Sequence, residues 1–131
     1  IQNTIPVKIK KTKLKPKKFS RAYILINEKN EILVRKRASK GMLASMLEVP
    51  NDNWMEKKSL LRRDIIINKI QKKLIRKGEL NYSFSHFDLY VDIFYKKIRK
   101  IDYPKNKWLN INKYSNSQLP TVMKKILETM I

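Results

Sequence analysis

The residues around position 90 constrain the fold most, because apolar side chains there occupy every second position. These apolar residues are Phe87, Leu89, Val91 and Ile93. Successive side chains of a β-strand point to opposite faces, so a period of two predicts a strand that buries one face. We therefore expect a half-buried strand within Tyr82–Lys96, which is incompatible with an all-helical fold.

Four other segments have the composition of strands. Ser20–Asn27 is rich in Tyr, Ile and Leu, and a polar turn separates it from Ile32–Arg37, which predicts a hairpin. Leu47–Val49 is a short extended piece that stops at Pro50, and Lys107–Ile111 is a further candidate strand.

Helical spacing is clear only at the end of the chain. Apolar residues follow the i, i+3, i+4 rule over 119–130, which predicts an amphipathic helix. The region 65–77 is ambiguous: Ile66, Ile70 and Leu74 repeat every four residues, as in a helix, whereas Ile65–Ile67 is a β-branched run typical of a strand. We favour a helix over 68–76 that is closed by Gly78.

These elements predict a single α+β domain with a mixed β-sheet flanked by few helices. The residues that we expect to be largely buried are Tyr23, Leu25, Leu33, Leu89, Val91, Trp108, Val122, Ile126 and Leu127.

The charge of the chain is strongly positive. It has 31 Lys+Arg against 11 Asp+Glu among 131 residues, a formal net charge of +20. Such a field favours polyanions, although a codon bias that inflates Lys, Ile and Asn explains the excess equally well. Residues 1–18 hold seven Lys, no acidic residue and two Pro, so we expect a basic, extended interdomain linker before a domain at 19–131.

Several chemistries are excluded by composition. The sequence has no Cys and one His, which excludes within this chain a disulfide, a thiol nucleophile, a cysteine-ligated cluster and a multi-histidine metal site. The apolar runs are too short for a membrane span and no signal peptide is visible, so we expect a cytoplasmic protein. The first residue is Ile, which suggests a fragment of a longer protein.

Three stretches together resemble the C-terminal domain of MutY-type adenine DNA glycosylases. Leu33–Pro50 is similar to the family's hairpin and R-x-x-x-G-L-x-x-x-x-E-x-P segment. Phe84–Leu89 resembles its F-S/T-H-x-x-L loop and strand, and Trp108-Leu109 with Leu119–Lys125 is similar to its closing L-P-x-x-M-R/K-K helix. The order and spread of these motifs make the resemblance specific.

The resemblance implies a Nudix-like fold without Nudix hydrolysis. Nudix hydrolases hold Mg²⁺ with clustered Glu residues on one helix, in a box resembling G-x5-E-x7-R-E-x-x-E-E-x-G. Where those residues should cluster, this chain has Lys and Arg, and Glu56 and Asp64 are not an equivalent pair. We expect no catalytic residue, metal or cofactor in this chain. In the family, adenine excision belongs to an N-terminal domain with an iron–sulfur cluster.

The resemblance also implies the partners and the site. The partners are double-stranded DNA with 8-oxoguanine opposite adenine and the N-terminal catalytic domain of the same chain, and we expect a monomer with no membrane contact. The lesion-recognition residues would be Phe84, Ser85 and His86, with Ser85 bonding the lesion. Phe84 would equally suit a core position, and His86 a packed polar one.

Phosphate contacts near this loop would come from four basic residues. They are Arg35, Lys36, Arg37 and Lys40, each of which would equally suit a solvated surface. We interpret Gly41 and Glu48 as structural, and Trp54 as a core residue. Two other functions remain open: a degenerate Nudix pyrophosphatase, and a generic basic nucleic-acid-binding domain that would not need the Phe84–His86 loop.

Overall fold

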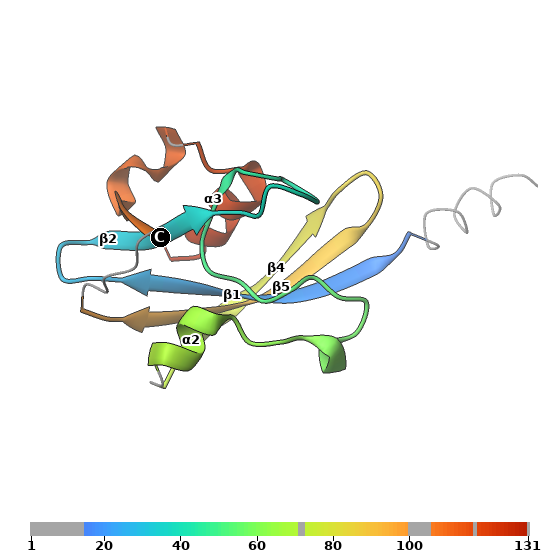
Figure 1. Cartoon of the computed structure of the whole chain (residues 1–131), viewed down its shortest axis with the longest axis horizontal. Coiled ribbons are helices and arrows are strands. Elements are labelled where there is room, and N and C mark those ends of the chain that lie inside the picture. Colours follow the sequence, from blue (N-terminus) through green and yellow to red (C-terminus); the bar gives the residue numbers. More distant parts are fainter. Residues whose placement is uncertain (1–14, 71–72, 100–105, 117, 131) are drawn as a thin grey trace, which may run out of the picture.

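Six strands form one mixed sheet in the computed structural model, which describes residues 15–70, 73–99, 106–116 and 118–130 (Figure 1). The elements follow in this order: β1 (Lys17–Ile26), β2 (Glu31–Lys36), β3 (Leu47–Glu48), the 3-10 helix η1 (Lys58–Leu60), α2 (Ile65–Ile70), β4 (Ile75–Ser83), β5 (Asp88–Lys97), β6 (Asn106–Asn110), the 3-10 helix η2 (Ile111–Asn116) and α3 (Thr121–Glu128). The strand order is β3-β2-β1-β5-β4, and β6 pairs with β2. The expected α+β class with a mixed sheet is confirmed.

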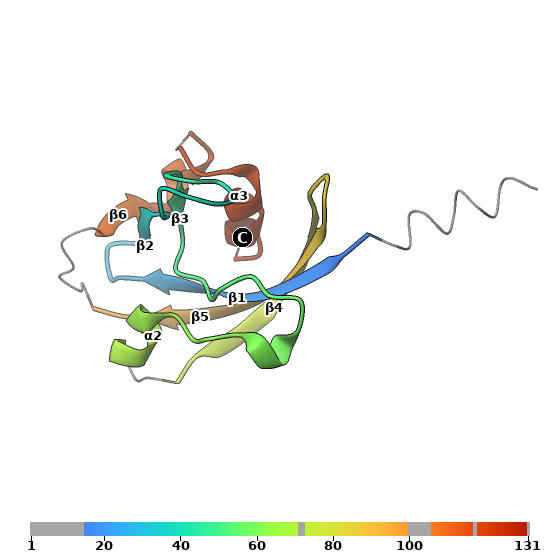
Figure 2. The ribbon, with the colours of Figure 1, turned by 45° about the vertical axis from the view of Figure 1, so that its right-hand side comes forward.

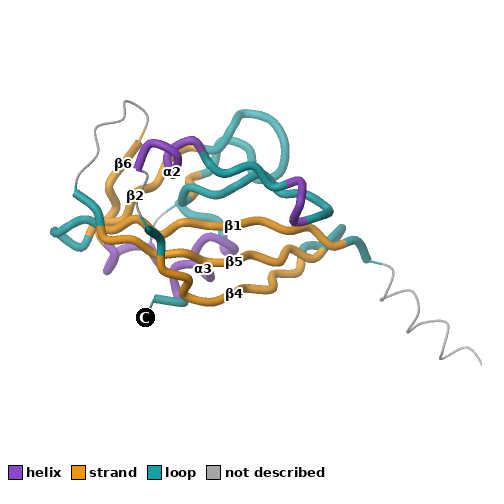
Figure 3. Tube along the Cα trace, turned by 90° about the horizontal axis from the view of Figure 1, so that it is seen from below, coloured by secondary structure: helices purple, strands orange, loops and turns teal. Residues whose placement is uncertain are grey.

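Strand β1 lies in the middle of the sheet. It runs parallel to β5 from the pair Lys17 and Asp88 to the pair Ile26 and Lys97, and Figure 3 shows β1, β5 and β4 side by side. Its other neighbour, β2, is antiparallel. Every residue of 22–26 is buried, because the sheet is covered on both faces there and a central strand then needs no polar side.

Alternating side chains of β1 enter two separate cores. Ala22 and Ile24 pack in the larger core, to which α3 contributes Val122, Met123, Ile126 and Leu127. Tyr23 and Leu25 pack in the smaller core with Ile66 and Ile67 of α2. Figure 2 shows α3 and α2 on opposite sides of the sheet. The two helices therefore cover different faces.

The predicted core residues are buried, with the exception of Trp108 and of Trp54, which is also half-buried. Trp108 is half-buried against the smaller core, because β6 lies beside β2 at the margin of the sheet, where Trp108 pairs with Leu33. The C-terminal helix is confirmed as α3, with Pro120 before its first residue.

The prediction of a helix over 68–76 is wrong in its bounds. Helix α2 starts directly after Asp64, whose side-chain Oδ1 accepts the N–H of Ile66 at 3.0 Å, as a helix-capping carboxylate does. Ile75 already begins β4, and Gly78 lies at a bulge between β4 and β5 instead of at a helix end. Strand β4 lies at the edge of the sheet and only half-buries alternate side chains, which explains its weak sequence signal.

Strand β1 begins before Phe19. Lys17 and Lys18 belong to β1, and the carbonyl of Pro16 accepts the N–H of Asp88 at 2.9 Å. Residues 1–14 of the expected linker lie outside the described residues. In the part of the chain that the structure describes, no helix has the length and apolarity needed to cross a membrane.

Candidate nucleic-acid interface

The connection between β4 and β5 presents two polar side chains to solvent. The N–H of Phe84 donates to the carbonyl of Phe87 at 2.9 Å, which closes the turn. Ser85 and His86 at its tip are exposed, whereas Phe84 is half-buried and Phe87 is buried. The turn therefore offers the Ser85 hydroxyl and the His86 imidazole while its two Phe side chains pack against the protein.

Four rings support this turn, and we call them the aromatic cluster: Trp54, Tyr82, Phe84 and Phe87. The centroid of the Phe84 ring lies 4.9 Å from that of Tyr82, 5.0 Å from that of Phe87 and 5.8 Å from that of Trp54. Tilted and edge-to-face ring pairs at these separations are favourable. Phe84 thus anchors the turn from within, and stacking on a base would require it to leave this packing.

A polar group that we call the basal clamp holds the start and end of the same connection. The Lys15 ammonium donates to Ser83 Oγ at 2.6 Å, and the Ser83 hydroxyl donates to Asp88 Oδ1 at 2.7 Å. Lys15 Nζ also lies 3.2 Å from Asp88 Oδ1. The Ser83 hydrogen bond, with the hydrogen bond and charge of Lys15, lowers the pKa of Asp88 although partial desolvation opposes this.

A hollow of about 410 Å³ opens beside Trp54, and we call it the Trp54 hollow. Its lining consists of Lys18, Arg37, Ala38, Met42, Glu48, Asn51, Asp52, Asn53 and Trp54. The Arg37 guanidinium lies 4.6 Å from the Trp54 ring centroid, and Lys18 Nζ lies 4.8 Å from that of Phe87. Two cations therefore face the aromatic cluster where the hollow meets the turn.

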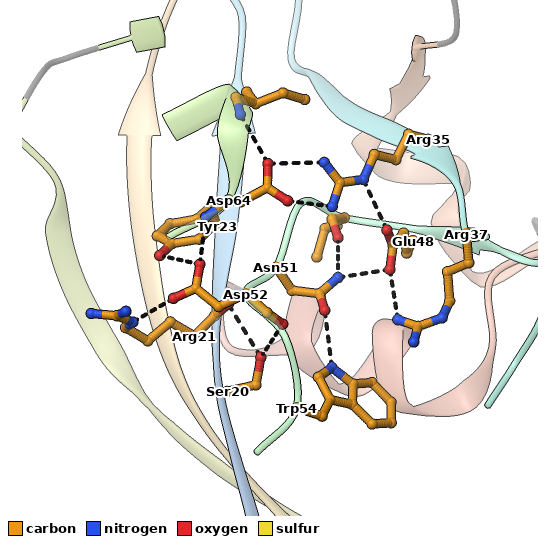
Figure 4. A network of polar contacts seen from close by, with 12 residues as sticks. Ser20, Arg21, Tyr23, Arg35, Arg37, Glu48, Asn51, Asp52, Trp54 and Asp64 are labelled. Carbon is orange, nitrogen blue, oxygen red and sulfur yellow. Dashed lines mark hydrogen bonds and ion pairs between the residues drawn. The ribbon is translucent and has the colours of Figure 1, made fainter. Parts of the chain in front are cut away.

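Beneath the hollow, the carboxylate of Glu48 is buried and fully engaged (Figure 4). Arg35 Nε donates to Oε2 at 2.8 Å, while Arg37 Nη1 and Asn51 Nδ2 donate to Oε1 at 2.7 and 2.8 Å. Asn51 Oδ1 accepts the indole N–H of Trp54 at 2.9 Å. Glu48 therefore organises β2, β3 and the Trp54 hollow, which agrees with our structural interpretation of this residue.

Two further carboxylates extend the network. Arg35 forks onto both oxygens of Asp64, whose N–H donates to Asp52 Oδ1 at 2.8 Å. Asp52 has no exposed side-chain surface, and it accepts the Tyr23 hydroxyl at 2.8 Å and the Arg21 Nε–H. Burial and the Asp52 hydrogen bond raise the pKa of Tyr23. Burial alone would lower the pKa of Arg35, but its bonds to Asp64 and Glu48 raise it.

The donor set does not fit the divalent metal of a Nudix hydrolase. Glu48 and Asp64 both form ion pairs with the guanidinium of Arg35, and Asp52 forms one with Arg21. The negative charge that Mg²⁺ would neutralise is therefore already neutralised by arginine. The residues described in the structure include no group of three His, Cys, Asp or Glu arranged to hold a metal ion.

The four basic residues expected to bind phosphate differ in their surroundings. Arg35 is committed to Glu48 and Asp64 inside the network. Arg37 bonds Glu48 and the Met42 carbonyl yet borders the hollow. Lys36 and Lys40 are exposed. Arg37 and the two lysines thus lie where a phosphate could reach them, whereas Arg35 serves the fold.

The sequence analysis missed Lys15, Lys18 and the lining role of Trp54. The basic run at the start of β1 and the aromatic character of Trp54 were visible, but their neighbours lie far along the chain. Trp54, for example, packs against Phe84.

The fold and the site define the class of this protein: it is a Nudix domain. Its sequence matches the NUDIX domain family over residues 21–129, so the chain belongs to that family. Comparison with curated proteins gives no match.

Solved structures with this fold include proteins with different names and bound partners. The C-terminal domain of mouse MUTYH, in a complex with human PCNA, is similar at a TM-score of 0.68 and 17% identity, covering 86% of each chain. The MutT protein of Methanosarcina mazei Go1 has a TM-score of 0.65 and 15% identity, covering 88% of this chain and 93% of that one. The NUDIX domain of Shewanella oneidensis NrtR, complexed with ADP ribose, has a TM-score of 0.63 and 9% identity, covering 91% and 89%. Such identities show the shared fold.

Proposed function

We propose that this chain is the DNA lesion-recognition domain of an adenine DNA glycosylase, reading 8-oxoguanine opposite adenine. The β4–β5 turn carries the proposal. It exposes the side chains of Ser85 and His86, while the aromatic cluster and the basal clamp hold the turn in place. Excision of the adenine would belong to a catalytic domain of the same protein. The fold likeness to the MUTYH C-terminal domain supports this assignment.

The chemistry of the lesion matches a hydroxyl at Ser85. 8-Oxoguanine differs from guanine by a carbonyl at C8 and a proton on N7, so its reader needs an acceptor for N7–H and a donor for O8. A hydroxyl supplies either role. Guanine offers an acceptor at N7 instead. A mismatched contact costs on the order of 1–3 kcal/mol, so one residue contributes a useful share of the discrimination.

Nudix hydrolysis is the alternative that the fold raises, and the network of Figure 4 argues against it. A carboxylate held by two arginines, as Glu48 is, must lose those partners before it can bind Mg²⁺. Arg37 would then lose its carboxylate partner and Arg35 one of its two, which is unfavourable for partly buried cations. A test with nucleoside diphosphate derivatives and Mg²⁺ or Mn²⁺ should therefore give no turnover above background.

The test of lesion reading is the substitution Ser85→Ala. It removes one exposed hydroxyl and leaves charge and backbone unchanged, so the phosphate contacts that supply most of the affinity should persist. Binding would be measured by fluorescence anisotropy at one fixed salt concentration, with duplexes that carry adenine opposite 8-oxoguanine or opposite guanine. We expect the preference for the lesion to fall about tenfold, a loss on the order of 1–2 kcal/mol.

Two matched variants complete this experiment. Ser59→Ala removes an exposed hydroxyl from η1 and should leave the lesion preference unchanged. Ser85→Thr keeps a hydroxyl at the tip of the turn and should retain most of the preference. If Ser85→Ala and the double variant Ser85→Ala, His86→Ala both discriminate as well as the parent, the turn is not the reader. A parent that binds both duplexes equally well would instead indicate a generic nucleic-acid-binding domain.

A further inference from the structure

A second hollow, of about 310 Å³, lies on the other face of β1 from the Trp54 hollow. Because strand side chains alternate, Lys18 of β1 lines the Trp54 hollow, whereas Arg21 and Tyr23 line the second one. Arg63, Lys73, Leu74 and Phe94 complete its lining. We call it the Arg63 hollow, and it has no part in the lesion reading proposed above.

The charged residues described at the rim of the Arg63 hollow are all basic. They are Arg21, Arg63 and Lys73. Within the described residues, neither Arg63 nor Lys73 has a carboxylate close enough for an ion pair. Their positive charges are therefore available to bind an anion, and they repel one another until an anion binds.

Arg21 is held in place at this rim. Its Nε donates to the buried carboxylate of Asp52, and Figure 4 shows its guanidinium on the far side of Asp52 from Glu48. Because the bond to Asp52 uses Nε, the terminal nitrogens extend beyond the carboxylate. A guanidinium fixed in this way loses little conformational freedom when it binds an anion.

The rest of the lining is apolar. Phe94 and Leu74 are half-buried, and behind them the Tyr23 ring is stacked on Phe94 with centroids 5.9 Å apart. The Tyr23 hydroxyl is already satisfied by Asp52 at 2.8 Å. A ligand that fits this lining has an anionic group for the rim and a flat, weakly polar part for Phe94 and Leu74.

We propose that the Arg63 hollow binds a nucleotide unit, its phosphate held by Arg21, Arg63 and Lys73 and its base or sugar against Phe94 and Leu74. Arginine forks match phosphate oxygens, and a ring packed on an aromatic side chain adds to the affinity. Pockets for small ligands span about 300–1,000 Å³, so this volume suits a single unit. The unit is either a free mononucleotide or one residue of a DNA strand.

An amide NMR titration of the whole chain tests the proposal. The probes are inorganic phosphate, deoxyadenosine, deoxyadenosine monophosphate and a short single-stranded oligodeoxynucleotide. We expect the monophosphate or the strand to shift the amide signals of Arg21, Arg63 and Leu74, and to bind more tightly than phosphate or nucleoside alone. Binding of the strand without the mononucleotide would identify the strand as the source of the unit.

Paired charge variants distinguish a specific nucleotide site from non-specific electrostatic binding of the nucleotide. Arg63→Gln with Lys73→Gln should weaken nucleotide binding at least tenfold. Lys29→Gln with Lys113→Gln removes the same charge from exposed positions that line neither hollow, and should leave binding unchanged. Equal losses in both variants, no shifts at the hollow, or a monophosphate and a strand that both bind no more tightly than phosphate or nucleoside would overturn the proposal. The lesion preference of Ser85→Ala is measured separately and does not depend on this result.

Discussion

Loss of Arg35 should destabilise the fold, because its guanidinium joins Glu48 to Asp64. The substitution Arg35→Met keeps an unbranched apolar stem but leaves two nearly buried carboxylates short of their shared cation. Removing one partner of a buried ion pair costs about 3–5 kcal/mol, and the partial exposure of Arg35 favours the lower end. Chemical denaturation should show a loss of about 3 kcal/mol in the free energy of unfolding.

The neighbouring Lys36 provides a matched control for this prediction. It is exposed and has the same formal charge, so Lys36→Met should change the free energy of unfolding by less than about 0.5 kcal/mol. An Arg35→Met variant as stable as Lys36→Met would contradict a structural role for the network.

Residue-level predictions from the sequence succeeded where a side chain's role follows from its own chemistry. Glu48 is structural, as expected, and Ser85 and His86 are exposed. The sequence could not assign a partner to Arg35, because Asp64 reaches it only after the chain has folded back. The Arg35 guanidinium was therefore expected to bind phosphate or face solvent, whereas the structure shows it in ion pairs.

Among the elements, the β4–β5 hairpin should depend on its basal clamp. Since the fold lowers the pKa of Asp88, the clamp contributes stability above the unfolded pKa of this carboxyl, and that contribution is lost as pH falls through its lowered folded pKa. Ser83→Ala should raise the pKa of Asp88 toward its ordinary value, because the Ser83 hydrogen bond is the largest single cause of the lowering, and Lys15→Met, which removes a hydrogen bond and a charge, should raise it as well. NMR titration of the Asp88 carboxyl measures both.

The amide NMR shifts of the turn can show whether the basal clamp positions it. In the parent, the amide shifts of Ser85 and His86 should follow the titration of Asp88 at acidic pH. Lys97→Met, at the far end of β5, should leave both the pKa and these shifts unaltered. If the amide shifts of the turn do not change as Asp88 titrates, the clamp stabilises the hairpin without orienting its tip.

How well an element could be predicted from the sequence depended on its place in the sheet. The alternation in β5 and the apolar run of β1 were clear, because both strands are central and bury large side chains. Strand β4 lies at the edge, and its exposed residues Ile75, Arg76 and Lys77 carry no burial pattern. Because apolar residues recur every four positions, we expected the helix to continue to residue 76. Pairing with β5 instead makes residues from Ile75 onward a strand.

For the whole molecule, the net charge of +20 predicts binding to DNA that weakens steeply with salt. Each neutralised phosphate contributes a slope of about 0.9 log unit per log unit of salt. Residues 1–14 hold four Lys and precede β1, so deleting them should flatten the slope without removing an element of the described sheet. Binding assays over a salt series, on the full chain and the truncated one, measure both slopes.

Two outcomes of that series would count against a role for this charge. Equal slopes in the two proteins would leave residues 1–14 without phosphate contacts. A slope near zero in the full chain would mean that its lysines reflect codon bias.

The parallel pairing of β1 with β5 also affects how the chain reaches its native state. β1 is synthesised before β5, so Lys17 must wait for Asp88, and the pairing then runs the length of both strands. Contacts between residues so distant in sequence close slowly, because a long stretch of chain must be ordered before they form. Until β5 is made, the apolar residues 22–26 lack the strand that shields one side of them, as they would on a nascent chain still attached to the ribosome.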